Sequence, residues 1–349
     1  MLELKGRVTA PAPREVWREV LAQDPDAVVS QSPEWLDALC AAGHHADASR
    51  LYELPGGRNL ILPMVRRVGL PNGYRVEASL PAAWGMGGIV APGGASGEDV
   101  AAVFSELASR VQLRTSISPS PLLASAWAAA RPSGTTTVAR RAHVLKLDRP
   151  FGKLWSERFT GSARTAVRKA ERSGLTVECD VSGRLVPVFY ELFEQSLRRW
   201  ASQQHEPAAL ALWRGRRRDP MHKFELMSKL LGDACRIWVA WSDGRPAAAI
   251  LVLQRGNAHY TRGAMDKELA GPTRANYLLH SRAIEDACSA GCRVYHMGES
   301  GRSESLAQFK TRFGAEAHDY AEYHLERFAI TTADKRARAV VKRIIGFRD

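Results

Sequence analysis

Three consecutive strand-like segments in the second half of the chain limit its fold most strongly. They are Cys235–Trp241, Pro246–Leu253 and Ala258–Gly263, with turns at Asp243-Gly244 and Gly256-Asn257. A helix from Arg274 to Ala290, ended by Gly291, and a strand at Val294–Met297 follow them. An antiparallel meander that continues into a helix and another strand predicts an α/β fold with mixed sheets.

The first half of the chain repeats this order of elements. A hairpin at Leu51–Val68 precedes a helix at Glu98–Arg110, and a long strand follows at Thr135–Leu147. Pro and Gly interrupt the pattern near residues 148–152, which is typical of a domain boundary. The sequence therefore predicts two mixed α/β domains, residues 1–150 and residues 151–349.

Composition and charge limit the classes of protein. The 349 residues are 45% hydrophobic and contain no apolar run of the ~18 residues that a membrane span needs. The N-terminal stretch has no apolar core of signal-peptide type, so we expect a cytoplasmic protein without a membrane span. Residues 151–349 carry a net charge of +10 and residues 1–150 only +2. This asymmetry indicates a polyanionic partner, unless it reflects a GC-rich genome that favours arginine.

A basic helix is expected near residues 162–173. Arg164, Arg168 and Arg172 are four residues apart and share one face, with Lys169 beside them. Guanidinium groups in such a row repel one another unless anions lie between them, and they form bidentate bonds to phosphates. The alternative is a solvated surface helix that Glu171 partly neutralises.

A second basic cluster spans residues 214–218. It contains Arg214, Arg216, Arg217 and Arg218 and adjoins Trp213 and Pro220. We interpret it as a mobile loop that follows a nucleic-acid backbone, with the tryptophan stacking on a base. A solvated run of charge is the alternative.

Lys310 lies between two aromatic residues in the segment QFKTRFG. Phe309 and Phe313 are four residues apart and are expected to anchor the segment in the core. A lysine beside buried aromatics has few rotamers, so its ammonium can stabilise an oxyanion or a phosphate at a defined place. A lysine that extends along an amphipathic turn into solvent is the alternative.

Polar residues also gather at the end of the strand Val294–Met297. His296, Glu299 and Ser300 lie there, and Gly298 permits a turn. Strand ends in α/β folds commonly face ligands, so Glu299 is a candidate for holding an amine and Ser300 for hydrogen bonding.

The common catalytic and metal-binding motifs are missing. The sequence has no GxSxG elbow, no GxxxxGK[ST] loop and no GxGxxG after a strand. The five cysteines are scattered without a second Cys/His pair at finger spacing, which indicates buried reduced thiols. We expect neither a metal nor a cofactor.

Several of these motifs together resemble the FemABX-type branch of the GNAT superfamily. The pattern RxxxRKAExxG occupies 164–174 and FKxxFG occupies 309–314. Between them lie the helix segment 276–279 and the strand 294–298, and SQSPEWLDAL at 30–39 resembles the opening of the first repeat. The likeness spans about residues 28–328, and the order and spacing of the motifs carry it.

This resemblance implies two tandem GNAT-like acyltransferase domains. It implies transfer of an aminoacyl group to an amine, with aminoacyl-tRNA as the usual donor. In the family the lysine of the FK pair lies near the reacting centre, which corresponds to Lys310, and a basic residue of the RKAE helix holds acceptor phosphates, which corresponds to Arg164 or Arg168. The long helical arm of the peptidoglycan-bridge enzymes has no counterpart here. The chain is thus more similar to members that act in peptide-antibiotic or small-molecule pathways.

An acyl-CoA donor requires backbone N–H groups at a Gly-rich turn before a helix. The corresponding stretch, LAGPTRAN at 269–276, has one glycine, and Pro272 lacks an N–H. We expect poor binding of coenzyme A there, whereas an aminoacylated CCA end can dock on Arg274 and nearby aromatics.

We therefore expect an aminoacyltransferase that forms an amide from aminoacyl-tRNA and the amine of a small molecule or peptide. An ester donor is already activated, so catalysis needs mainly positioning and charge stabilisation. Lys310 would stabilise the oxyanion, and Glu299 would orient or deprotonate the amine. The residues expected to bind substrate are Trp84, Tyr260, Arg262, Arg274, Asn276, Tyr277, His296, Ser300 and Phe309. An acyl-CoA N-acyltransferase and a non-catalytic RNA-binding protein are the alternatives, and a monomer is favoured over an oligomer.

Overall fold

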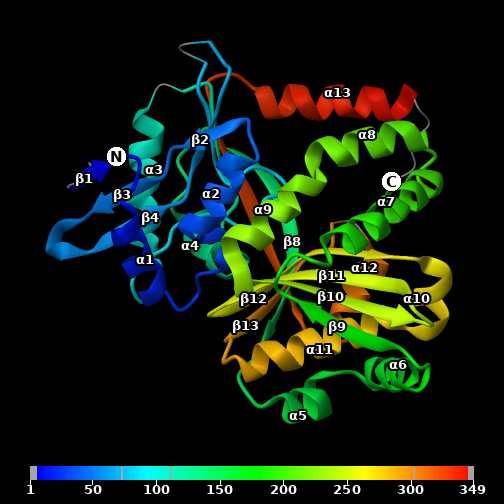
Figure 1. Cartoon of the computed structure of the whole chain (residues 1–349). Coiled ribbons are helices and arrows are strands. Elements are labelled where there is room, and N and C mark those ends of the chain that lie inside the picture. The colour runs from blue at the N-terminus through cyan, green and yellow to red at the C-terminus, as the bar shows by residue number, and fades with distance from the viewer. Residues whose placement is uncertain (1–5, 72–73, 111, 302, 345–349) are drawn as a thin grey trace. The chain divides into compact units, whose positions relative to one another are not determined.

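The computed structural model describes residues 6–71, 74–110, 112–301 and 303–344, so the first five residues of the N-terminal stretch discussed above lie outside the described residues. The chain forms two compact units (Figure 1). One comprises the residues up to Ala142 together with His318–Asp334, and the other comprises His143–Ala317 and the residues from Lys335 onward. The chain passes between the units within β8 (Thr136–Lys146), β14 (Glu316–Glu326) and α13 (Ile330–Ile344).

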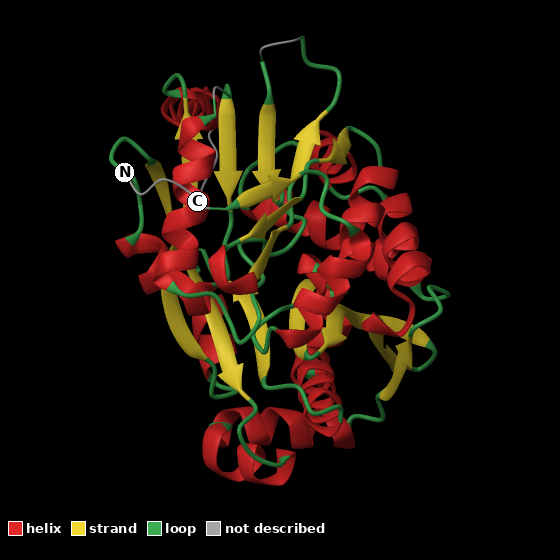
Figure 2. Ribbon diagram, turned by 90° about the vertical axis from the view of Figure 1, so that its left-hand side faces the viewer, coloured by secondary structure: helices red, strands yellow, loops and turns green. Residues whose placement is uncertain are grey.

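The first unit contains both helices and short strands, and Figure 2 distinguishes the two by colour over the whole chain. Its elements are β1 (Arg7–Thr9), α1 (Arg14–Gln23), α2 (Pro33–Ala41), β2 (His45–Asp47), β3 (Arg50–Glu53), β4 (Asn59–Leu62), β5 (Val65–Arg67), β6 (Val76–Ser79), α3 (Gly97–Ser109), β7 (Arg114–Ile117) and α4 (Ala124–Ala129), with 3-10 turns at Val29–Gln31, Pro55–Gly57 and Pro121–Leu123. One sheet has the order β1-β3-β4, and a second runs β2-β5-β6-β7-β14. Strands β6 and β7 are parallel, whereas β7 and β14 are antiparallel with Ile117 opposite Tyr323.

Local capping fixes the helix starts of the first unit. The Ser32 hydroxyl accepts a hydrogen bond from the Trp35 amide, and Pro33 occupies the first turn, as the sequence predicted. Ser96 and Asp99 form a reciprocal capping box at the start of α3. The helix α3 then packs its apolar side into the core.

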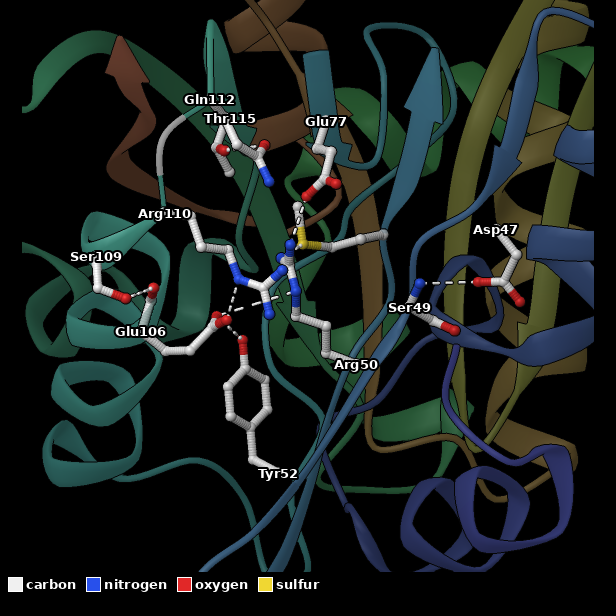
Figure 3. Close-up of polar contacts among 11 residues, drawn as sticks. Asp47, Ser49, Arg50, Tyr52, Glu77, Glu106, Ser109, Arg110, Gln112 and Thr115 are labelled. Carbon is white, nitrogen blue, oxygen red and sulfur yellow. Dashed lines mark hydrogen bonds and ion pairs between the residues drawn. The ribbon is translucent and has the colours of Figure 1, made fainter. Parts of the chain in front are cut away.

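A buried ion network joins three elements of the first unit. Arg50 on β3 donates to the Glu77 carboxylate at 2.5 Å, and the Tyr52 hydroxyl donates to Glu106 on α3 at 2.9 Å (Figure 3). Glu106 also pairs with Arg110 one turn later. Two arginines and two carboxylates balance one another, so this network fixes β3 and β6 against α3 and needs no ligand.

The second unit is built around an antiparallel meander. Its elements are α5 (Phe151–Lys153), a π-helical turn (Leu154–Arg158), α6 (Gly161–Arg172), β9 (Thr176–Asp180), α7 (Val186–Gln203), α8 (Ala208–Arg218), α9 (Met221–Leu231), a 3-10 turn (Gly232–Ala234), β10 (Cys235–Ser242), β11 (Arg245–Arg255), β12 (Asn257–Met265), α10 (Lys267–Thr273), α11 (Ala275–Ser289), β13 (Val294–Glu299) and α12 (Glu304–Thr311). The strands lie in the order β13-β12-β11-β10-β9. The predicted mixed α/β fold is confirmed, and β10, β11 and β12 each contain the strand segment that was predicted there.

Helices cover both faces of this sheet. In Figure 1, α6 and α11 lie below the strands and α7 and α8 above them, with α6 packed on α11 and α7 on β11 and β12. The two basic helices α6 and α8 are therefore on opposite faces of one sheet. None of the described helices has the length and apolar character to cross a membrane.

Two local expectations are wrong. Arg214–Arg218, predicted as a loop, forms the last turns of α8 because Gly215 packs against Leu197, where a Cβ would lie 2.4 Å from a methyl group of that leucine. The stretch 269–276, predicted as a turn before a helix, begins inside α10 (Lys267–Thr273). Arg274 then adopts a left-handed backbone (φ 61°) and starts α11.

Candidate active site

The site lies where β12 and β13 part. Within the described residues, their parallel pairing is limited to Ala258 opposite Tyr295 and His259 opposite His296. Beyond this point a bulge interrupts β12: Tyr260 pairs with Val252 and Arg262 with Leu251, so Thr261 is the extra residue. Strands that separate in this way leave backbone groups and side chains accessible to a ligand.

Gly298 turns β13 away from its neighbour. Its φ of 72° is the left-handed conformation that glycine adopts without strain, as its place in the sequence indicated. A Cβ here would lie 3.3 Å from the Tyr260 carbonyl oxygen, so the close approach also favours glycine. The turn directs the carbonyl oxygens of residues 298 and 299 toward α12.

Lys310 comes from α12, which Ser303 caps by accepting a hydrogen bond from the Leu306 amide. The Lys310 ammonium donates to the carbonyl oxygens of Gly298 at 2.9 Å and Glu299 at 2.6 Å. Only 2% of the residue is exposed, so the alternative of a solvent-directed lysine does not hold. Burial lowers the pKa of Lys310 to about 8, although the nearby Glu299 carboxylate opposes the shift. An ammonium has three N–H groups, so these two bonds leave one donor for a ligand.

Aromatic side chains surround this lysine on the α11 side of the sheet. The His280 ring lies 4.6 Å from the Tyr260 ring and 5.4 Å from the Phe309 ring, and Tyr277 lies 4.9 Å from Phe309. Burial lowers the pKa of His280 to about 3 and raises the pKa of Tyr260 to about 12. Both groups are therefore neutral near pH 7, and the cations of this cluster are Lys310 and Arg312, whose guanidinium donates to the Tyr277 hydroxyl at 2.8 Å.

Glycine at position 263 makes room for Tyr260. A Cβ on Gly263 would lie 2.2 Å from the tyrosine hydroxyl oxygen. The tyrosine thus extends along its own strand, between the bulge and α11.

A second buried pair lies at the residues where the strands are still joined. The rings of His259 and His296 are 6.0 Å apart in an edge-to-face arrangement. Burial, His296, Arg262 and Lys310 together lower the pKa of His259 to about 3. His296, expected to bind substrate, is 1% exposed in this structure.

Arg262 is held by a buried carboxylate that sequence reasoning missed. Asp219, between α8 and α9, accepts hydrogen bonds from Lys223 at 2.7 Å and from Arg262 at 3.1 Å. Burial lowers the pKa of Lys223 to about 8 even though Asp219 opposes the shift. The i, i+4 spacing of Asp219 and Lys223 was the available signal, but the run of arginines before it obscured the carboxylate.

Glu299 and Ser300 follow the turn at Gly298. The Glu299 side chain is exposed, and its backbone rather than its carboxylate contacts the Lys310 ammonium. Ser300 is 5% exposed. The structure thus brings Lys310, Glu299, Tyr260, Tyr277 and Phe309 together around one strand end.

The residues expected to bind phosphate differ in availability. Arg164 donates to the carbonyl oxygens of Trp155, Ser156 and Phe159, and so closes the π-helical turn. The side chains of Arg168, Lys169 and Arg172 are exposed on α6.

On α8, ion pairs engage most of the cluster. Arg214 pairs with Glu206, Arg216 with Glu194 and Arg218 with Asp219. Arg217 instead lies 5.5 Å from the centre of the Trp213 ring.

The remaining predicted residues have separate surroundings. Arg274 is exposed at the start of α11, and the Asn276 amide donates to the Met265 sulfur at 3.0 Å. Trp84 belongs to the first unit, where its carbonyl accepts from the Trp35 indole and its ring packs edge-to-face on it. With 8% exposure, Trp84 is a core residue of that unit.

Comparison with known proteins identifies the class of the second unit. Residues 157–320 match the family model described as an acetyltransferase (GNAT) domain. No curated protein matches the chain. The fold is similar to that of FemX, with 13% identity, 91% of this chain and 96% of FemX covered, and a TM-score of 0.65. A conserved protein of unknown function from Bacteroides thetaiotaomicron is 8% identical, with 92% and 98% covered and a TM-score of 0.54.

Residues 157–320 therefore form a GNAT domain, and the fold of the whole chain is similar to that of FemX. This likeness of fold agrees with the resemblance inferred from the motifs at 164–174 and 309–314. Lys310 and the parting strands β12 and β13 both lie within the matched domain.

Proposed function

We propose that this protein transfers an aminoacyl group from aminoacyl-tRNA to the amine of a small molecule or peptide. We expect this reaction to be a step in the biosynthesis of a peptide natural product. The amine nitrogen attacks the ester carbonyl carbon, and a C–N bond forms as the carbonyl oxygen becomes an oxyanion. The tetrahedral intermediate then breaks the C–O ester bond. The terminal ribose oxygen leaves with the proton that the amine loses, so no ATP is consumed.

The buried ammonium of Lys310 is the observation that carries this proposal. Two of its N–H groups are fixed by the carbonyl oxygens of Gly298 and Glu299. The third can donate to the oxyanion, and a preorganised donor in a water-poor site stabilises developing charge more than water does. Glu299 is the residue after Gly298, and its exposed carboxylate can accept the amine proton, either itself or through a water.

A carboxylate at the end of β12 argues against coenzyme A as the donor. Asp266 caps α10 by accepting hydrogen bonds from the amides of Glu268 and Leu269. Asp266 thus occupies N–H groups at the start of α10 that a pyrophosphate bound there would need. A donor without a pyrophosphate, such as an aminoacyl ester, avoids this conflict.

We assign the tRNA backbone to the α6 side of the sheet. Arg168, Lys169 and Arg172 are exposed on α6, which packs on α11, and Arg274 is exposed at the start of α11. The α8 cluster is the weaker candidate because Arg214, Arg216 and Arg218 are ion-paired.

The test compares donors on the purified chain. A mixture of tRNAs charged with radiolabelled amino acids is incubated with a panel of amines, and labelled acetyl-CoA is supplied in parallel reactions. Product that requires charged tRNA and disappears after ribonuclease treatment supports the proposal. Product from acetyl-CoA alone would identify an acyl-CoA N-acyltransferase. Salt-sensitive binding of charged and uncharged tRNA with equal affinity, without product, would identify an RNA-binding protein.

A further inference from the structure

A hollow of about 740 Å³ lies beside α7 in the second unit, apart from the Lys310 cluster. Its wall is formed by Gln195, Arg199, Met265, Asp266, Lys267, Glu268 and Pro272. The end of β12 and the first turn of α10 thus form one side, and the last turns of α7 form the other. The hollow is large enough for part of a peptide.

Arg199 is the half-buried cation of this wall. Its guanidinium forms no ion pair with any carboxylate in the part of the chain that the structure describes, in contrast to Arg198, which pairs with Glu194 at 3.7 Å. Burial lowers the pKa of Arg199, and only the longer-range attraction of Asp266 opposes the shift. A desolvated cation without a paired anion gains most from an anionic ligand.

The contacts of Arg199 leave one edge of its guanidinium group available. Nη1 donates to the Met265 carbonyl oxygen at 2.8 Å, and the Ser196 hydroxyl is within 3.3 Å of the same oxygen. The Trp200 ring lies 5.7 Å from the guanidinium carbon. The group is therefore fixed through Nη1, and the Nε–Nη2 edge is the one with which arginine binds carboxylates in a bidentate manner.

The hollow is connected to the Lys310 cluster by direct contacts. The Asn276 amide donates to the Met265 sulfur, and the adjacent Tyr277 ring packs on Phe309. At about 3.3 Å per strand residue, Met265 and Tyr260 are roughly 15 Å apart, which is the length of four or five extended peptide residues. Glu268 and Asp266 give the wall negative charge as well, which disfavours a ligand that is anionic throughout.

We propose that this hollow binds the C-terminal carboxylate of a short peptide, with Arg199 as the residue that recognises it. This inference rests on the proposed function only in taking the peptide as the acyl acceptor, whose amine then extends toward Lys310. It makes Arg199 a specificity-determining residue and selects peptides with a free carboxylate over their amides.

The test measures binding in the absence of any donor. Tetraalanine, tetraalanine amide and inorganic phosphate are titrated separately into ¹⁵N-labelled protein, and the Arg199 Nε–H signal is followed by NMR. That signal is assigned as the one missing from the R199Q spectrum. We expect tetraalanine to shift it and to bind at least about tenfold more tightly than the amide, because only the acid forms a charge-assisted bidentate pair.

Substitutions at Arg199 and at the neighbouring Arg198 test whether Arg199 causes this preference. R199Q is expected to lose the preference for the acid, R199K to keep only part of it, and R198Q to retain it within about twofold. Equal affinity for acid and amide, no shift with either peptide, or tighter binding of phosphate than of tetraalanine would overturn the assignment. The affinities of the two peptides can be measured from any signal that shifts, without assigning it to Arg199, so this comparison remains decisive if R199Q does not fold. If the peptide binds but charged tRNA gives no product, the proposed function fails and the carboxylate site stands.

Discussion

The Lys310 ammonium lies 2.6 Å from the backbone carbonyl oxygen of Glu299, which accepts a hydrogen bond from it. The two residues that the sequence paired as catalysts therefore meet through the backbone, and the Glu299 carboxylate is left exposed. The carbonyl orients the ammonium without neutralising its charge, and a charged donor is what an oxyanion requires. The backbone of Glu299 holds the ammonium, so we assign its carboxylate the separate task of accepting the amine proton.

That task can be tested with Glu299→Gln. We expect the variant to fold normally and to lose about 10²-fold or more in kcat, because a positioned base contributes on that order and an amide cannot accept a proton. Rates are measured with the labelled amide product. Glu304→Gln on α12 is the matched control, since it removes another exposed carboxylate nearby. A kcat for Glu299→Gln equal to that of the control would remove Glu299 from the mechanism.

Removing the ammonium should have a larger effect. Lys310→Ala is expected to lower kcat by about 10²–10³-fold, the usual cost of deleting one oxyanion donor. Because the residue is buried, circular dichroism and urea unfolding must accompany the rates. Lys229→Ala, at an exposed position on α9, is the control for loss of one lysine. A folded Lys310→Ala protein with wild-type turnover contradicts the proposed role.

The pH dependence of kcat should reflect the titration of Lys310. Its pKa is lowered to about 8 by burial, so the ammonium is lost as pH rises through 8. We expect kcat to fall above that pH, opposite to the rise expected from deprotonating the attacking amine. Lys310→Arg keeps its charge throughout the range and should lack the alkaline fall, whatever its absolute rate. An alkaline fall that persists unchanged in Lys310→Arg would assign it to another group.

The parts of the fold that were predictable are those that local patterns determine. The helix predicted from Arg274 to Ala290 and the strands of the meander follow from periodicity and turn residues. The end of α8 was missed because its stability comes from distant residues. Gly215 fits against Leu197, and Arg216 pairs with Glu194 on the neighbouring helix. Such contacts override a run of arginines that, read alone, indicates a loop.

The candidate site was predictable in part for the same reason. The flanking phenylalanines indicated that Lys310 would be held in place, and it is. Its partners are backbone carbonyls whose direction depends on the positive φ of Gly298, and no side-chain pattern encodes that direction. Arg164 shows the opposite case. Its spacing suggested phosphate binding. Its guanidinium instead donates to carbonyl oxygens at the π-helical turn, which the sequence did not reveal.

Asp219 is expected to dominate the stability of the second unit. Its carboxylate is fully buried and accepts hydrogen bonds from Arg218, Lys223 and Arg262, so Asp219→Asn removes the charge that these three cations share. Deleting one member of a buried ion pair typically costs about 3–5 kcal/mol. We expect a loss of that size in the free energy of unfolding, measured by urea titration near pH 7. Asp233→Asn, whose carboxylate is 82% exposed, should change it by less than about 0.5 kcal/mol. Equal losses in the two variants would mean that Asp219 contributes no more than a surface charge, and Arg262 would then owe its position at the β12 bulge to packing alone.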